Sequence, residues 1–239
     1  MGNTDTGRQR DSESDAYAVR QYDPDDRESF QALFETVFDQ PFSEGMFEFK
    51  FEHNPYLSHV PILLAEADGE IVGARGFLAR RVRAGDRTVV ALEATDAMVH
   101  PDHRHQGVYA RLVEYTVERY ADSEAALRFS FPNQLSLPGT LKQGARLVGT
   151  IPMYYRLQNP AACLESSDDA LSTRLARRIG GPLARGYLGA RDRIRSASSD
   201  GVVIRRHTEI PATDLGALYE RSAPEVLHTI RDEEFYRQR

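Results

Sequence analysis

The sequence predicts an α/β fold with one mixed β-sheet, and two observations carry this prediction. Residues 61–67 and 70–77 are two strand-like runs joined by an Asp-Gly pair, the strongest short signal of a β-hairpin. Residues 108–120 then carry apolar side chains at helical spacing, and a short strand pattern follows at 126–131. A strand, a helix and a strand in this order imply a parallel crossover added to an antiparallel meander, so the sheet is mixed.

The remaining elements follow from local patterns. Alternating apolar and polar residues predict a first strand at Tyr17–Tyr22, and acidic residues followed by apolar ones at helical spacing predict a helix that includes Phe30–Phe38. A second short helix is expected from Ser43 to Phe51, because Asn54-Pro55 would end it. Further along the chain we expect a turn at 84–86, a long strand at 88–99, a short helix at 135–143 and a last strand at 147–157.

The composition bounds the class of protein. The chain has 239 residues, 41% of them hydrophobic, which is enough for a sizeable core. Its net charge of −6 provides no overall positive field for nucleic acid. No run of about 20 apolar residues predicts a membrane span, and residues 1–15 are polar, like a disordered tail rather than a signal peptide. A cytoplasmic location is therefore expected.

A loop between the long strand and the next helix carries the main functional signal. Arg104 and Gly107 form an Arg-x-x-Gly pattern just before the helix begins. The first amides of a helix have no intrahelical partner and lie at the positive end of the helix dipole, an arrangement suited to a diphosphate. Gly107 would let the backbone approach the phosphates, and Arg104 could add a bidentate contact. Taken alone, the pattern is common in ordinary strand–helix connections.

In its context after a meander, this loop resembles the cofactor motif Arg/Gln-x-x-Gly-x-Gly/Ala of the GCN5-related N-acetyltransferase (GNAT) superfamily. Arg104 and Gly107 match, and Tyr109 departs from the usual Gly or Ala. The resemblance covers about residues 18–157 and implies a GNAT-like fold, with a meander, a crossover helix, a parallel strand pair and a C-terminal extension. It implies acetyl-CoA as co-substrate, with no metal. The cofactor-binding residues that it implies are Ala97, Met98 and Val99 along the pantetheine arm, and Arg104, His105, Gln106, Gly107, Val108 and Tyr109 at the diphosphate.

A second part of the resemblance lies after the short strand at 126–131. Asn133, Ser136, Thr140 and Gly144 fall at the offsets of a family pattern, in which Asn133 would contact pantetheine or CoA. Thr140 stands where relatives have the tyrosine that protonates the departing thiolate. A threonine hydroxyl is a far poorer acid than a phenol. Tyr109, Tyr154, Tyr155 or solvent could take over this role, and the sequence does not choose between them.

The general base is expected on the long strand. Amine acylation needs a neutral nucleophile, so a carboxylate or a histidine should remove a proton directly or through water. Glu93 matches the position of the glutamate base in histone-type relatives and is our predicted catalytic residue. Asp96 lies on the opposite face of the strand by parity, unless a bulge intervenes. The alternative for Glu93 is a solvated or hydrogen-bonded strand carboxylate. His100, His103 and His105 lack the ligand spacing of a metal site, so none is expected, and a phosphate-facing or surface role is expected for them instead.

Four segments divide the chain: a disordered tail at 1–15, a GNAT domain at 16–160, an Arg-rich helical connector at 161–200, and the start of a possible second GNAT-like unit at 201–239. The last of these predictions rests on a weak sequence similarity between residues 203–220 and residues 18–35, which are 185 positions apart. Such a unit would be truncated, or a degenerate extension packed on the first domain. The Arg-rich stretch favours a connector over a membrane-surface or nucleic-acid-binding helix, because Gly and Pro at 180–182 interrupt it.

These observations predict an N-acyltransferase that moves an acetyl group from acetyl-CoA to a primary amine, directly within a ternary complex. The alternative is a non-catalytic GNAT-fold module that binds CoA or regulates, which the missing tyrosine acid favours. The acceptor would be a small-molecule or peptide amine, and no nucleic-acid or membrane partner is expected. Phe47, Phe51, His53 and Tyr56 predict an aromatic-lined acceptor entrance. The oligomeric state cannot be read from the sequence.

Overall fold

A computed structural model describes residues 16–134, 136–154, 181–195, 201, 203 and 205–237. The chain divides into two compact units. The first comprises the chain up to Arg146 together with His207 onward, and the second comprises Leu147–Arg206.

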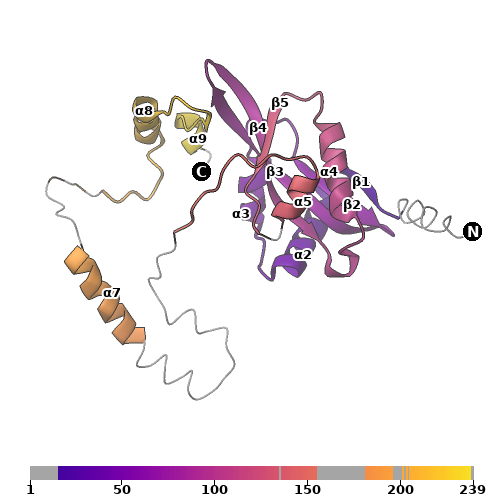
Figure 1. The fold of residues 1–239 in the computed structure, drawn as a ribbon, viewed down its shortest axis with the longest axis horizontal. Coiled ribbons are helices and arrows are strands. Elements are labelled where there is room, and N and C mark those ends of the chain that lie inside the picture. The colour runs from indigo at the N-terminus through magenta and orange to yellow at the C-terminus, as the bar shows by residue number, and fades with distance from the viewer. Residues whose placement is uncertain are drawn as a thin grey trace, which may run out of the picture. The chain divides into compact units, whose positions relative to one another are not determined.

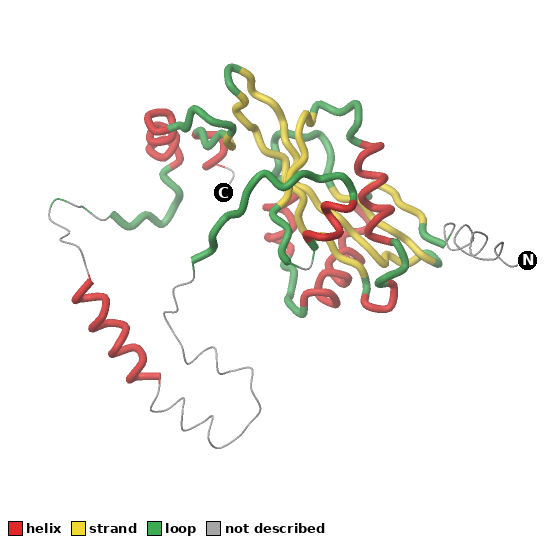
Figure 2. Tube along the Cα trace, in the orientation of Figure 1, coloured by secondary structure: helices red, strands yellow, loops and turns green. Residues whose placement is uncertain are grey.

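The first unit is built on a six-stranded mixed sheet, which confirms the predicted fold class (Figures 1 and 2). Strands β1 to β4 pair antiparallel in chain order, and β4 pairs parallel with β5. Two-residue turns join β2 to β3 and β3 to β4, as the Asp-Gly and Gly-Asp pairs predict. The strands are β1 (Ala18–Gln21), β2 (Ile62–Ala67), β3 (Glu70–Ala84), β4 (Arg87–Val99), β5 (Ala125–Ser130) and β6 (His228–Thr229).

Helices pack on both faces of this sheet (Figure 1). Asp23 caps the 3₁₀ turn that precedes α2, and Ser43 caps α3 by accepting a hydrogen bond from the Met46 amide. The predicted second helix therefore exists, but its second half is a π-helical turn. The helical elements of the first unit are η1 (Pro24–Asp26), α2 (Arg27–Phe38), α3 (Glu44–Phe47), η2 (Glu48–Glu52), η3 (Pro101–His103), α4 (Val108–Arg119), α5 (Leu137–Lys142), α8 (Ala212–Ser222) and α9 (Glu233–Arg237).

The core lies in two clusters, one for each face of the sheet. Leu112 of α4 packs with Leu63 and Leu92 on one face. On the other, aromatic rings of α2, α3 and η2 meet edge to face, with Phe30 in contact with Phe47 and Phe51. The prediction that Phe47 and Phe51 line an entrance is therefore wrong. Their exposed fractions are 0% and 1%, because ring–ring packing encloses them.

The C-terminal residues add a short strand to the same sheet. In β6, Thr229 pairs with Val82 of β3, and the Ile230 amide donates to the Arg81 carbonyl at 2.8 Å. The Arg81 guanidinium lies 3.0 Å from the Asp232 carboxylate, and Ile230 is buried. Residues 228–232 are thus part of the first unit. The domain boundaries themselves stay predictions.

The last predicted strand, at 147–157, is wrong over residues 147–154, which form no strand. The apolar side chains of this segment, such as Val148 and Ile151, are exposed, and the segment pairs with no strand of the described residues.

Two predicted segments lie outside the described residues: the tail at 1–15, and residues 155–180, which include the end of the predicted last strand and Cys163. Within the predicted connector, α7 (Gly181–Arg195) is helical. In the described part of the chain, no helix combines the length and apolar character that a membrane span requires.

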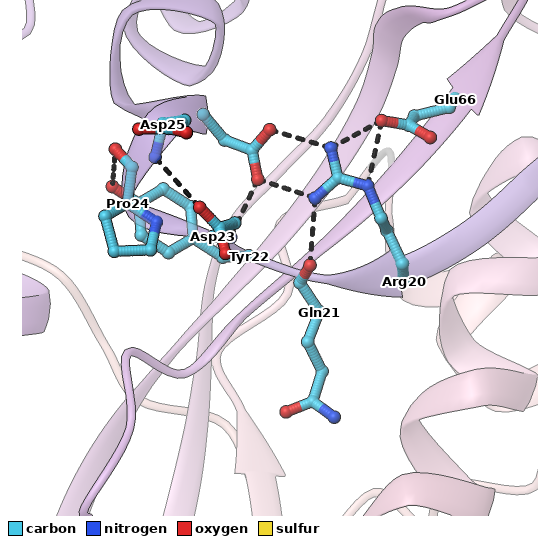
Figure 3. A network of polar contacts seen from close by, with 8 residues as sticks. Arg20, Gln21, Tyr22, Asp23, Pro24, Asp25 and Glu66 are labelled. Carbon is cyan, nitrogen blue, oxygen red and sulfur yellow. Dashed lines mark hydrogen bonds and ion pairs between the residues drawn. The ribbon is translucent and has the colours of Figure 1, made fainter.

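A bidentate ion pair ties the first strand to the first helix (Figure 3). The Arg20 Nη1 and Nη2 atoms donate to the two carboxylate oxygens of Asp26 at 2.6 and 2.7 Å. Arg20 Nε also donates to Glu66 on β2 at 2.9 Å, and the Asp23 amide donates to Asp26. These hydrogen bonds, that from Arg20 above all, hold the pKa of Asp26 below its ordinary value.

We expect Asp26→Asn to lower the free energy of unfolding by about 1 kcal/mol at pH 7, because the amide cannot accept both guanidinium bonds. The folded-state pKa of Asp26 is lowered, so its contribution is complete above the ordinary value of about 4 and is lost as the pH falls through the folded-state pKa. Urea unfolding at pH 7 and at pH 2.5, roughly the acid end of this range, tests both points. Asp25→Asn is the control, since the exposed Asp25 carboxylate makes no such contact. An equal effect of both changes would contradict the assignment.

Candidate functional site

The sheet opens where β4 and β5 separate. Their parallel pairing ends at Ala94 and Ser130, and among the described residues no strand lies beside Thr95–Val99 on that side. Within this stretch β4 has a bulge, because its register with β3 shifts and Asp96 has a φ of 45°. The backbone groups at the end of β4 are thereby left for a ligand or for water.

The loop after β4 contains two residues with left-handed backbone conformations. Gly107, just before α4, has a φ of 84°, and His105 has a φ of 64° without being glycine. A left-handed residue other than glycine is strained by about 1 kcal/mol, and such strain concentrates at functional sites. The start of α4 also lies very close to β3. A Cβ at Gly73 would come within 2.7 Å of the Val108 side chain, so only glycine permits this approach.

The first amides of α4 have no partner within the helix. Arg111 donates the first intrahelical hydrogen bond, to the Gly107 carbonyl at 3.1 Å, and no side chain caps the helix. The amides of Val108, Tyr109 and Ala110 precede that bond. Together with the positive end of the helix dipole, these amides offer donors of the kind that suits an anion.

A cavity of about 280 Å³ lies against this loop and the end of β4. Six of the residues predicted to bind the cofactor line it. Arg104 donates from Nε to the Val99 carbonyl at 3.2 Å. That bond orients the guanidinium and leaves its two terminal nitrogens without a hydrogen bond to the described residues. The lining residues are Val99, His103, Arg104, His105, Gly107, Val108, Tyr109 and Ala110.

Four predicted binding residues lie outside this lining. Met98 faces the core, and Ala97 is exposed on β4. The Gln106 side chain bonds to the protein instead, donating to the Asp102 carbonyl at 2.8 Å. Asn133 follows β5, and its Oδ1 accepts a hydrogen bond from the Ser136 amide at 3.0 Å.

The predicted acid position holds a hydroxyl that is already bonded. Thr140 Oγ1 donates to the Ser136 carbonyl at 3.0 Å within the α5 region. Of the three tyrosines that could replace it, Tyr109 lines the cavity, Tyr154 is exposed in the second unit, and Tyr155 lies outside the described residues.

Glu93 and Asp96 lie on the same face of β4, because the bulge cancels the alternation that parity predicts. Each of the two carboxylates forms an ion pair with a basic side chain on this face. Arg80 Nε donates to Glu93 Oε2 at 2.9 Å, and Lys50 Nζ donates to Asp96 Oδ2 at 2.5 Å. Glu93 Oε1 makes no hydrogen bond to the described residues, so this oxygen could take a proton.

A small hollow of about 40 Å³ lies beside these ion pairs. His53 and Tyr56 line it, so the structure brings together two of the four residues predicted at an acceptor entrance. Phe49 and Phe235 supply aromatic rings there in place of Phe47 and Phe51. The full lining is Phe49, Lys50, His53, Asn54, Pro55, Tyr56, Leu78, Ala79, Arg80 and Phe235.

Arg75 of β3 is a feature that the sequence reasoning missed. Its guanidinium lies 5.7 Å from the centroid of the Tyr109 ring and 5.3 Å from that of Phe77. Its Nε and Nη1 atoms are buried and find no hydrogen-bond partner in the described ranges. Burial lowers the pKa of Arg75, since it disfavours the charged form. An arginine inside the apolar run 70–77 was the available signal. The Tyr109 ring packs on the Arg75 guanidinium. This contact gives a large side chain a place at a motif position where Gly or Ala is usual.

Three histidines of the loop do not form a metal site. His100 and His103 pack ring to ring at a centroid distance of 5.9 Å. Across the described part of the chain, no group of three His, Cys, Asp or Glu side chains is arranged to hold a metal ion.

Solved structures of several acetyltransferases are similar to this chain. An acetyltransferase of Trypanosoma brucei is 17% identical, with a TM-score of 0.47 over 59% of this chain and 99% of that one. A glucosamine-6-phosphate N-acetyltransferase of Arabidopsis thaliana is 14% identical, with a TM-score of 0.48 over 58% and 97%. An aminoglycoside N-acetyltransferase in complex with CoA is 18% identical, with a TM-score of 0.47 over 59% and 94%. Similarity this distant indicates nothing about acceptor or mechanism. No curated protein sequence matches the chain.

The sequence itself is decisive for the family. The profile of the acetyltransferase (GNAT) domain matches residues 18–148, more than half of the chain. This range contains β1 to β5, the parting of β4 from β5 and the loop before α4. The chain therefore belongs to the GNAT family of acetyltransferases.

Proposed function

We propose that this protein transfers an acetyl group from acetyl-CoA to a primary amine, directly within a ternary complex. The observation that carries the proposal is the start of α4. Three backbone amides there precede the first intrahelical hydrogen bond of the helix. They follow Gly107, which has a left-handed backbone conformation, and their residues line the cavity. These groups fit the diphosphate of CoA, which is an anion that needs several donors at close range.

The cofactor would be held by the residues around this cavity. The amides of Val108, Tyr109 and Ala110 donate to the diphosphate, and the terminal nitrogens of Arg104 add charge-assisted bonds. The unpaired edge of β4 at Ala97–Val99 pairs with the pantetheine arm, while Asn133 stays a predicted contact on the other side of the opening. Acetyl-CoA, when bound, supplies an activated acyl group as a thioester.

The amine would enter from the α3 face of the sheet. Glu93 accepts the proton of the amine on Oε1, because Arg80 already occupies Oε2. His53, Tyr56 and Phe235 line the neighbouring hollow and would contact the acceptor, a small molecule or a peptide. Removing one proton leaves a neutral amine whose nitrogen attacks the thioester carbonyl. The C–S bond breaks as the amide forms, and the departing thiolate of CoA takes up the second proton of the amine through solvent. Positioning both substrates in one complex lowers the barrier further.

Calorimetric titration of acetyl-CoA into the full chain tests binding, and thiol release over a panel of amines tests transfer. We expect binding and release with at least one amine. No binding by the intact protein would contradict the cofactor site. Binding without release for any amine would favour a CoA-binding module, the alternative that Thr140 supports by lacking a phenol.

Gly107→Ala should weaken acetyl-CoA binding by about tenfold or more, because an alanine shifts the backbone away from the left-handed conformation that aims the amides. It should also cost about 1 kcal/mol of stability. Gly85→Ala is a matched control. Gly85 also has a positive φ and open space where a Cβ would lie, but it is at the opposite end of β4. Calorimetry should show lost affinity for Gly107→Ala alone, and thermal unfolding should show a similar loss of stability for both.

Glu93→Gln should lower kcat by about 100-fold or more at pH 7 while leaving acetyl-CoA affinity unchanged. The loss should shrink as the pH rises, because the amine then loses its proton to solvent. Asp96→Asn serves as control on the same face and should keep most of the activity. Full turnover by Glu93→Gln across the pH range would show that the proposed base is wrong.

Arg75→Met should leave the stability of the ligand-free protein unchanged or raise it by about 1 kcal/mol, since a buried, unpaired cation is removed. Acetyl-CoA affinity should nevertheless fall by about tenfold, because that charge lies beneath the first turn of α4. Arg128→Met is the control, an exposed arginine on β5. Equal losses of affinity would mean that net charge, and not the buried position, is responsible.

A further inference from the structure

A chain of side-chain hydrogen bonds connects the loop before α4 to the start of β1. The hydroxyl of Tyr17, which is 8% exposed, donates to Gln106 Oε1 at 2.6 Å and lies 3.1 Å from His103 Nδ1. Gln106 Nε2 in turn donates to the Asp102 carbonyl at 2.8 Å. Arg111 of α4 donates to the Tyr17 carbonyl at 3.0 Å, so the same tyrosine is held from both sides.

The protons in this chain can be assigned one after another. The Asp102 carbonyl can only accept, so the amide nitrogen of Gln106 faces it and Oε1 faces Tyr17. Oε1 can only accept as well, so the single proton of the Tyr17 hydroxyl goes to Gln106. The Tyr17 oxygen must then accept from His103, which fixes the proton of a neutral His103 ring on Nδ1.

The other ring nitrogen of His103, Nε2, therefore carries the lone pair of the neutral ring. Nε2 makes no hydrogen bond to the described residues, and His103 is part of the lining of the 280 Å³ cavity. The titratable or charged groups around this ring are Tyr17 from the start of β1, Arg111 from α4, and His100, Asp102, Arg104 and His105 from the loop itself.

We propose that His103 binds the CoA diphosphate through Nε2, taking up one proton from solvent as it does so. This inference rests on the proposed function, since it needs CoA in the cavity. A neutral ring with its proton on Nδ1 offers the diphosphate only a lone pair, whereas a protonated Nε2 donates a charge-assisted hydrogen bond. Tyr17 can accept from Nδ1 whether or not Nε2 carries a proton, so the ring can take up this proton without turning.

The consequence is that CoA binding strengthens as the pH falls through the range in which imidazoles change charge, about pH 8 to 5. The phosphomonoester of CoA titrates in the same range, with a pKa of about 6, and contributes its own pH dependence. That part is common to all variants of the protein. The difference between the wild type and a His103 variant therefore isolates the histidine.

His103→Asn is the informative variant, because the asparagine amide can still donate to the Tyr17 oxygen while the Nε2 position is lost. Calorimetric titration of CoA into the full chain, in two buffers of different ionisation enthalpy, gives the number of protons taken up. We expect the wild type to take up as much as about one proton more than His103→Asn near pH 7. Its affinity should also gain about fivefold to tenfold more between pH 8.5 and pH 6, as a single charge-assisted bond would give.

Nitrogen NMR of the His103 ring gives a second measurement, which needs no variant. At pH 8.5 the ligand-free ring should be in the Nδ1-protonated form, and adding CoA at pH 7 should produce the doubly protonated form. His207→Gln, a change at an exposed histidine outside these contacts, should leave proton uptake as in the wild type.

Equal proton uptake by the wild type and His103→Asn would overturn the proposal, as would a ring that stays neutral when CoA binds. Either result would leave the proposed function intact. A wild-type protein that binds no CoA at any pH would instead remove the proposed function itself.

Discussion

The geometry of this protein depends on one constraint, the close approach of α4 to β3. With no side chain at Gly73, Val108 can lie directly on the strand, and the helix begins over the end of the sheet. The left-handed Gly107 turns the chain into the helix at that point, so three amides face outward together. Burial of Val108 and Leu112 in the core fixes the helix axis. The start of α4 is thus positioned by packing on the sheet as well as by the hydrogen bonds of the loop before it.

The bulge in β4 organises the opposite side of the sheet. One extra residue at Asp96 brings two carboxylates onto one face, where Arg80 and Lys50 meet them. The same irregularity comes just after the parallel pairing with β5 ends. The opening between the strands therefore has donors of α4 on one side and ionised side chains on the other.

Much of the fold could be predicted from local signals. The Asp-Gly turn identified the first hairpin, and the helical spacing from Val108 to Tyr120 gave α4, because turn chemistry and amphipathic period are properties of a few neighbouring residues. Two wrong predictions depended on distant parts of the chain. A strand at 147–154 needs a partner that the described residues do not provide. Phe47 and Phe51 are buried because they pack in one cluster with sheet residues such as Leu64 and Met98, which are more distant in sequence.

The features of the candidate site also fall into those that neighbouring residues reveal and those that depend on contacts between distant residues. The Arg-x-x-Gly spacing pointed to the loop that lines the cavity, since such a spacing is a property of neighbouring residues. Arg75 escaped notice because its position beneath the Tyr109 ring arises only in three dimensions. His103 was noticed as one of three loop histidines, but its contact with Tyr17 could not be read from the sequence. The bulge at Asp96 left no trace in the alternation of β4, so parity separated two carboxylates that share a face.

The pairing of the C-terminal strand β6 with β3 determines which fragments of this protein would stay in solution when produced separately. Beyond Gly76, β3 has lost β2 as a neighbour, and β6 covers part of the remaining edge while Ile230 is buried against the unit. A fragment that stops before His207 would present bare strand edge and uncovered apolar surface to its surroundings. Exposed edges recruit strands from other molecules, so such a fragment would tend to self-associate and precipitate.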